Sequence, residues 1–386
     1  MLAAKAGAED VFRALSKCAH LHVVLRELLR VFNEESKVIW WFSTCLEEQA
    51  LSATITDDDL LFQCMAQFPH GSKLVKLVID RRVSPSAMKT MSICPSWPPE
   101  PCTPVIWALF ARPRIENDPI LALLSRCNAE LPTYKTPKTK ISAAFACLLD
   151  KTRIPILNAL LEKDRDHVLA YTIPGPIFSH IASYPEPITE VVDEELTLDM
   201  AALHLGNLKA FQSLGGGGEA NDGSLHIAAQ LALPDFVDYL LDQHDPNHKT
   251  DGGGIPLAMA CGAKENSWCK FANEEGDYRD RQNRTIQQLA KQTRSDWKWH
   301  GTGLLHIALE NGVRVTEMMI EALDILNDVE RDERYLYLDK EGLYYSPYQW
   351  LLRFRPDIKE AEALARCLTE AGLSWQPVAP SADWMC

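Results

Sequence analysis

Apolar residues recur at helical spacing through much of the chain. Between Leu21 and Phe32 they stand at offsets 0, 3, 4, 7, 8 and 11, which places them on one face of an amphipathic helix. Similar stripes occur at 74–78, in the run 208–214 and near the end, at 358–368. The pattern predicts a mostly helical chain whose short helices each bury one face.

Proline and glycine interrupt these stripes at intervals. Residues 92–104 hold five prolines and predict an extended connector, while 131–139 predicts a turn. The proline-rich segment 173–187 is the least regular part of the chain, and a further repeat could be hidden near Pro176. The four glycines at 215–218 follow a helical run and predict a helix end and a turn. A phosphate-binding loop would require a following Gly-Lys-Ser/Thr, which this run lacks.

Two short stretches of the chain echo each other. Residues 222–229 read Asp-Gly-Ser-Leu-His-Ile-Ala-Ala, and residues 303–308 read Gly-Leu-Leu-His-Ile-Ala. An apolar helical run follows each of them, at 236–241 and at 315–323. A box of this kind that opens a pair of helices is typical of a repeat array, in which each unit packs on its neighbours.

The box resembles that of ankyrin repeats, whose unit of about 33 residues carries Thr-Pro-Leu-His-x-Ala at its first helix. Degraded copies begin at Thr103, Ile255 and Ser346, and 198–202 keeps the paired alanines. A Ser or Thr before Pro suits a helix start, because the hydroxyl can accept a bond from a free amide. The resemblance implies that His226 and His306 bridge backbone groups between repeats.

The resemblance further implies an all-α fold, an ankyrin-like helical solenoid of about eight or nine helix-turn-helix units. We expect an N-terminal helical cap at 1–56, in which Trp40 and Trp41 are buried. Divergent repeats would follow at 57–200, and clearer repeats at 201–376 would contain an insertion at 262–300. A C-terminal tail would occupy 377–386.

Net charge, apolar runs and cysteine spacing each disfavour some functional classes of protein. The formal net charge is −14 and the sequence shows no dense basic run, which argues against nucleic acid and suits a protein partner with a basic patch. The sequence contains no run of 18 apolar residues, so we expect no membrane span. The first ten residues do not have the pattern of a secretory signal. The eleven cysteines lack metal-type spacing and predict buried free thiols, hence an intracellular, cytoplasmic or nuclear protein. We expect neither cofactor nor metal.

The segment 262–300 is the first candidate for a partner surface. It holds eight Lys or Arg against six Asp or Glu, together with aromatic side chains, within an acidic chain. Aromatic residues and Arg are over-represented at binding hot spots. The candidate contact residues are Trp268, Tyr278, Arg279, Arg281, Trp297 and Trp299. The alternative is that Ile286, Leu289 and Ala290 simply form the second helix of this repeat, on which the aromatics pack.

The second candidate is the turn at 339–345, where the family's projecting turn should lie. Its contact residues would be Tyr344 and Tyr345, although Tyr345 could instead pack on the helix that begins at Pro347. The sequence thus predicts a scaffold or adaptor that recognises a protein through a concave face and projecting turns. The alternative is an enzyme on a degenerate repeat scaffold, with a polar pocket near 173–200 or 262–300 and a strongly shifted ionisable group in it. The sequence contains no recognised catalytic motif.

Overall fold

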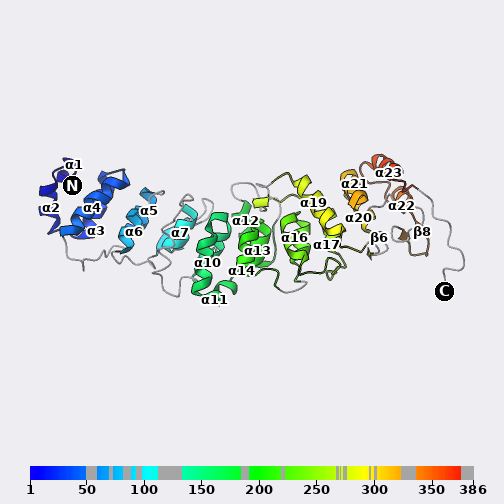
Figure 1. The fold of residues 1–386 in the computed structure, drawn as a ribbon, viewed down its shortest axis with the longest axis horizontal. Coiled ribbons are helices and arrows are strands. Elements are labelled where there is room, and N and C mark those ends of the chain that lie inside the picture. Colours follow the sequence, from blue (N-terminus) through cyan, green and yellow to red (C-terminus); the bar gives the residue numbers. More distant parts are fainter. Residues whose placement is uncertain are drawn as a thin grey trace. The chain divides into compact units, whose positions relative to one another are not determined.

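The computed structural model of the 386-residue chain describes residues 1–48, 59–68, 73–80, 88–92, 98–111, 133–183, 191–218, 222–266, 269, 271–272, 276–294, 297–299, 302–322 and 336–374. Most of these residues are helical, in agreement with the all-α prediction (Figure 1). The chain forms two compact units. Unit 1 comprises residues 1–181 and 192–198, and unit 2 comprises residues 182–191 and 199–386. The border crosses two helices, α12 and α13.

The described part of unit 1 consists of short helices and two small antiparallel two-stranded sheets, β1–β2 and β3–β4. Its elements are α1 (Leu2–Lys5), α2 (Glu9–Ser16), α3 (Leu21–Val31), α4 (Glu35–Glu48), α5 (Asp59–Gln67), α6 (Lys73–Asp80), β1 (Lys89–Met91), β2 (Glu100–Cys102), α7 (Pro104–Ala111), α9 (Ala143–Leu148), the 3-10 helix η1 (Lys151–Arg153), α10 (Ile154–Lys163), α11 (Arg165–Leu169), β3 (Thr172–Pro174), α12 (Gly175–Ser183) and β4 (Glu195–Thr197).

Unit 2 continues in the same manner. Its elements are α13 (Leu198–Leu205), α14 (Leu208–Leu214), α15 (Ser224–Gln230), α16 (Pro234–Leu241), α17 (Pro256–Cys261), α19 (Tyr278–Ala290), β5 (Lys298–Trp299), β6 (Thr302–Gly303), α20 (Leu304–Glu310), α21 (Val313–Ala322), β7 (Tyr337–Leu338), β8 (Tyr344–Tyr345), α22 (Pro347–Phe354) and α23 (Ala361–Glu370).

Helix pairs stack on one another within unit 2. The first helices contact one another in the order α15, α17, α20 and α22, and the second helices in the order α16, α19, α21 and α23. The box residues Leu225, Leu257 and Leu305 lie on successive first helices, and each is at most 2% exposed. Each of these leucines is therefore buried on a first helix that contacts the next one. In unit 1, α3, α5 and α7 contact one another in the same way.

The residues before the first helices form the helix starts that the sequence predicts. Ser346 and Gln349 make a capping box: the Gln349 amide donates to Ser346 Oγ over 3.2 Å, and Gln349 Oε1 accepts from the Ser346 amide over 3.1 Å. Thr103 Oγ1 accepts from the Ile106 amide in the same way. Proline is the first residue of α7, α17 and α22, where its missing N–H costs nothing.

Short hairpins precede several first helices. β1 pairs with β2 before α7, β5 with β6 before α20, and β7 with β8 before α22. The predicted connector at 92–104 thus contains the strand β2, and its last residue, Pro104, begins α7. The segment 173–187, expected to be irregular, contains the helix α12 (Gly175–Ser183), because Pro174 and Pro176 stand at its start, where proline is tolerated. The helix agrees with a further element hidden near Pro176.

Two expectations about single side chains change. In α4, Trp41 is 6% exposed as expected but Trp40 is 49% exposed, since neighbouring positions on a helix point in different directions. His226 bridges successive pairs as expected, because its Nε2 donates to the carbonyl of His248 over 2.9 Å. His306 does not show such a bridge among the described residues. Its Nδ1 accepts from the Gly303 amide in its own helix start, and its ring packs on Trp350 at 5.0 Å between centroids.

Three first helices end with the chain in a left-handed conformation. Gly206, Ala232 and Gly312 have φ angles of 74°, 53° and 96°. Each stands eight residues after the first residue of its helix, α13, α15 or α20. Gly215 (φ 82°) ends α14 in the same conformation, which confirms the helix end predicted at the glycine run. The same left-handed turn thus follows each of these three helices.

Replacing Gly206 by Ala is expected to destabilise unit 2 more than replacing Gly312. A Cβ at either site is strained at positive φ, at a cost of about 1–2 kcal/mol. At Gly206 the Cβ would also stand 3.0 Å from the backbone nitrogen of Ala272, whereas at Gly312 it meets no atom within 4 Å. The added crowding costs about 1 kcal/mol or more. Urea unfolding of Gly206→Ala and Gly312→Ala measures the difference, and equal losses would contradict it.

Candidate functional site

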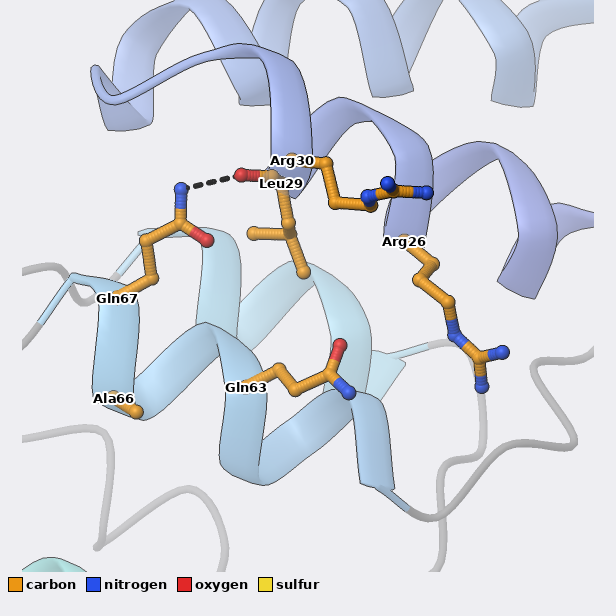
Figure 2. Close-up of a pocket in the computed structure, with 6 residues that line it drawn as sticks. All are labelled: Arg26, Leu29, Arg30, Gln63, Ala66 and Gln67. Carbon is orange, nitrogen blue, oxygen red and sulfur yellow. Dashed lines mark hydrogen bonds between the residues drawn. The ribbon is translucent and has the colours of Figure 1, made fainter.

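A groove lies between α3 and α5 and is larger than a hollow that adjoins it (Figure 2). It has a volume of about 540 Å³ and is open to solvent. Six residues line it: Arg26, Leu29, Arg30, Gln63, Ala66 and Gln67. A volume of this size lies in the range of ligand sites in proteins, and its open form suits a segment of chain better than an enclosed small molecule.

The amphipathic pattern of α3 places the two arginines in this groove. Leu21, Val24, Leu25, Leu28 and Leu29 are buried on the core side of the helix, each at most 5% exposed. The opposite side carries Arg26 and Arg30, which are exposed and four residues apart. Residues at this spacing lie one above the other on a helix, so both guanidinium groups border the same groove. Figure 2 shows them on the α3 side, opposite Gln63 of α5.

Gln67 joins the two walls of the groove. Its Nε2 donates to the carbonyl of Leu29 over 2.7 Å and to that of Phe32 over 2.9 Å. Both carbonyls lie at the C-terminal end of α3, where a helix leaves its last carbonyl groups without intrahelical donors. The side-chain amide of Gln67 therefore supplies hydrogen-bond donors to the last carbonyl groups of α3 and holds α5 against that helix. Gln63, one turn earlier on α5, faces the groove without such a bond among the described residues (Figure 2).

A second hollow adjoins the first and shares Arg30 with it. It has a volume of about 290 Å³ and is lined by Met1, Leu2, Lys5, Glu27, Arg30 and Val31. Arg30 Nη1 lies 2.9 Å from Glu27 Oε1, in a pair whose side chains are 73% and 36% exposed. Among the residues that line the two hollows, Lys5, Arg26 and Arg30 are basic and Glu27 is acidic.

The structure buries three of the side chains proposed as partner contacts. Arg281 is 5% exposed, Trp297 6% and Tyr345 7%. Arg281 Nη1 donates to the carbonyls of Ala272 and Gly276, the latter over 2.9 Å, so it holds the inserted segment in place. Tyr345 packs against Phe354 at 5.0 Å between ring centroids. These three residues support the fold, and their assignment to an exposed surface is corrected.

The other candidate contacts are placed differently. Arg279 is exposed, and Tyr278 and Tyr344 are half-buried. Trp268 and the side chain of Trp299 lie outside the described residues. The two candidate regions meet at neighbouring hairpins, because β6 contacts β7. The alternative interpretation of 262–300 holds for its helical part: α19 is the second helix paired with α17, and it buries Ile286, Leu289 and Ala290.

The enzyme alternative places a polar pocket near 173–200 or 262–300, and several residues in or near these segments have shifted pKa values. Burial is the main cause of each shift. Burial raises the pKa of the Cys261 and Cys269 thiols to about 12 and that of the Tyr278 phenol to about 12. It lowers the pKa of His204 to about 4. Each group is held in its neutral form at pH 7, whereas a nucleophilic cysteine needs the thiolate. Neither of the two described hollows lies at 173–200 or 262–300.

Among the described residues, neither the cysteines nor a cluster of metal-binding side chains points to a functional site. None of the eight cysteines in the described ranges is joined in a disulfide; Cys64 and Cys147 are fully buried, as expected, while Cys367 is partly exposed. Among the described residues, the structure brings together no group of three or more His, Cys, Asp or Glu side chains that could hold a metal ion. In the same residues, no helix combines the length and the apolar character that a membrane crossing requires.

The groove was not singled out from the sequence. The available signal was the pair of arginines on the polar face of the 21–32 stripe, in a chain that is otherwise acidic. The partner wall, Gln63 and Gln67, could not be found without knowing that α5 packs on α3. Comparison with known proteins does not supply a family: the chain matches no protein-family model, and no curated protein matches it.

Proposed function

We propose that this chain is a binding protein of the ankyrin-repeat type, which recognises another protein through its first helices and the hairpins before them. The observation that carries the proposal is the recurrence of one arrangement. A box opens a first helix, a second helix follows, and the pair packs on the next pair through like helices, as α15, α17 and α20 do. Stacked units of this kind function through extended surfaces that several repeats build together.

The energetics of the stack support a binding role. Each helix pair buries its box residues against the neighbouring pairs. The exposed positions on the first helices and hairpins can therefore carry different side chains without loss of the core. Gln230 of α15 is exposed on such a first helix, and Tyr344 is half-buried on the β7–β8 hairpin. Half-buried tyrosines in hairpins contribute large contact areas at little entropic cost.

Affinity capture with matched variants tests the proposal. Wild-type protein, Gln230→Arg and Tyr344→Ala are used to capture proteins from an extract of the source cell, and captured proteins are identified by mass spectrometry. We expect a set retained by the wild type and reduced by both variants. Asp238→Arg and Lys209→Glu alter exposed positions on the second helices α16 and α14 and serve as controls. Circular dichroism checks that every variant is folded.

Two results would count against the proposal. One is that the wild type captures nothing beyond what an unrelated acidic protein captures. The other is that the second-helix controls lose capture as strongly as Gln230→Arg and Tyr344→Ala, since the binding surface would then not follow the first helices and hairpins.

A further inference from the structure

One side of the helix α2 leaves apolar residues in solvent. Another side packs on α4, where Phe12 is 4% exposed and its ring centroid lies 4.8 Å from that of Trp41. Val11 is 53% exposed and Leu15 63%. The exposed apolar residues stand at offsets 0, 3, 4 and 7 and form what we name the α2 stripe: Val11, Ala14, Leu15 and Cys18.

The regular spacing sets the α2 stripe apart from the single exposed apolar residues that every protein surface carries. Residues three, four and seven apart lie on one face of a helix. Lys17, the residue after α2, keeps a right-handed helical backbone (φ −57°, ψ −30°), so Cys18 continues the face that Val11 begins. The same spacing forms the seam of two-stranded coiled coils. A continuous apolar surface of this kind marks a contact site.

Two opposite charges border the α2 stripe along one edge. Asp10 stands directly before Val11, and Lys17 stands seven residues after Asp10, so both occupy the same place beside the stripe. They are separated by roughly 10 Å along the helix, and both are exposed. Lys17 Nζ lies 3.4 Å from Glu48 Oε2, but the lysine side chain is 60% exposed and its ammonium group has three donors. A second carboxylate can therefore bind it beside Glu48.

We propose that α2 pairs with α2 of a second copy of this chain, antiparallel about a two-fold axis. The N-terminal end of one helix then lies beside the C-terminal end of the other, so Asp10 of each copy meets Lys17 of the other. The stripe is thus complementary to itself in charge as well as in apolar character. A parallel pair would place like charges together at both ends. Two-fold contacts between identical surfaces are the commonest form of self-association. The proposal goes beyond the partner binding proposed above and does not depend on it.

The size of the α2 stripe makes the dimer weak. Four residues per copy bury less than the roughly 1,200 Å² that a stable complex requires. The small side chain of Ala14 lets the two helices approach, so that Val11 and Leu15 of both copies come into contact. We expect a dissociation constant on the order of 10–100 µM. The chain would then be a monomer when dilute and would pair when it is locally concentrated, as when two copies bind one partner.

Sedimentation velocity of the full-length chain measures the pairing. Between about 1 and 300 µM we expect the weight-average sedimentation coefficient to rise from the monomer value towards that of a dimer. Leu15→Glu places a charge in the stripe and should weaken the dimer at least about tenfold. The control Leu352→Glu changes a leucine that is 51% exposed on α22 and should stay within about twofold of the wild type. Circular dichroism checks that both variants are folded. A chain that stays monomeric throughout, or equal losses in the two variants, would overturn the proposal.

Charge-reversed variants test the antiparallel arrangement. Asp10→Lys sets like positive charges together at both ends of the pair, and Lys17→Glu sets like negative charges together. Each variant alone should weaken the dimer about threefold or more. In an equimolar mixture of the two variants opposite charges meet again, so the mixed dimer should form within about twofold as well as the wild type. Effects inside one copy, such as the lost contact of Lys17 with Glu48, are the same alone and in the mixture. A mixture that associates no better than its components would contradict the arrangement.

Two other results would assign the α2 stripe a different occupant or no occupant. A wild type that stays monomeric, together with capture of another protein that Leu15→Glu abolishes, would show that the stripe binds that protein and overturn self-pairing. A dimer that Leu352→Glu abolishes and Leu15→Glu leaves intact would place the interface on α22 instead. Both results leave the tests of partner binding at Gln230 and Tyr344 unchanged.

Discussion

Unit 2 is expected to lose about 3 kcal/mol of stability between pH 7 and pH 5.5. Burial lowers the pKa of His204 to about 4 and that of His306 to about 3, and it also lowers the pKa of His226. In the unfolded chain these rings titrate near pH 6.5. The unfolded state therefore binds protons that the folded state does not, and stability falls as pH drops below about 6.5.

The size of the effect follows from the pH interval. An unfolded histidine with a pKa near 6.5 takes up most of a proton between pH 7 and pH 5.5, so each ring that stays neutral in the fold costs about 1.2 kcal/mol over this interval. His204 and His306 together account for about 2.5 kcal/mol, and His226 adds to this loss. Lys298 contributes to the lowered pKa of His306, after burial, by repelling the protonated ring. The full contribution is present above about pH 6.5.

Urea unfolding at pH 7 and pH 5.5, followed by circular dichroism, measures this loss. His306→Gln is the matched variant, because it removes one titrating ring while keeping a polar side chain of similar size. We expect the difference in unfolding free energy between the two pH values to shrink by about 1.2 kcal/mol in the variant, whatever its stability at pH 7. An unchanged pH difference would show that His306 is not kept neutral by the fold.

Replacing Glu100 by Ala is expected to destabilise unit 1 by about 3 kcal/mol. This carboxylate is 1% exposed in β2. Its Oε2 accepts from the amides of Lys138 and Thr139 over 2.8 and 3.2 Å, and its Oε1 accepts from Thr139 Oγ1. It thereby joins the β1–β2 hairpin to the turn before α9. Alanine would leave two amide groups without their acceptor, and removing a charged acceptor costs more than removing a neutral one.

Glu100→Gln separates the loss of charge from the loss of the acceptor. Glutamine keeps one side-chain oxygen that can accept from the two amides, so we expect it to cost about half as much as alanine. Chemical unfolding of both variants at pH 7 gives the comparison. Losses below about 0.5 kcal/mol in both would mean that the carboxylate does not hold the turn.

The helices and their starts could be predicted from the sequence because they depend on local chemistry. The stripe from Leu21 gives α3 and its buried side, since a helix repeats its faces every 3.6 residues. The Ser346 hydroxyl and the following proline define the start of α22 without help from distant residues. The glycine run ends α14 because Gly215 adopts a left-handed conformation at low cost.

The candidate contacts were less predictable because their exposure depends on packing between distant segments. Arg281 and Arg279 are two residues apart on α19, yet the first is buried under the inserted segment and the second is exposed. Charge alone does not tell them apart, since what decides is whether the carbonyls of Ala272 and Gly276 lie within reach. Likewise, the groove exists because Gln67 bonds α3, a contact across 38 positions of the sequence.

The position of α19 has a consequence for how such proteins can change. Residues 262–277 separate α17 from α19, but α19 still packs on α17 as its paired helix and on both neighbouring second helices. The connection between two packed helices can thus lengthen while their packing is kept. Part of this connection is itself buried, since Cys269, Phe271 and Ala272 are at most 3% exposed, so the added chain also enlarges the core.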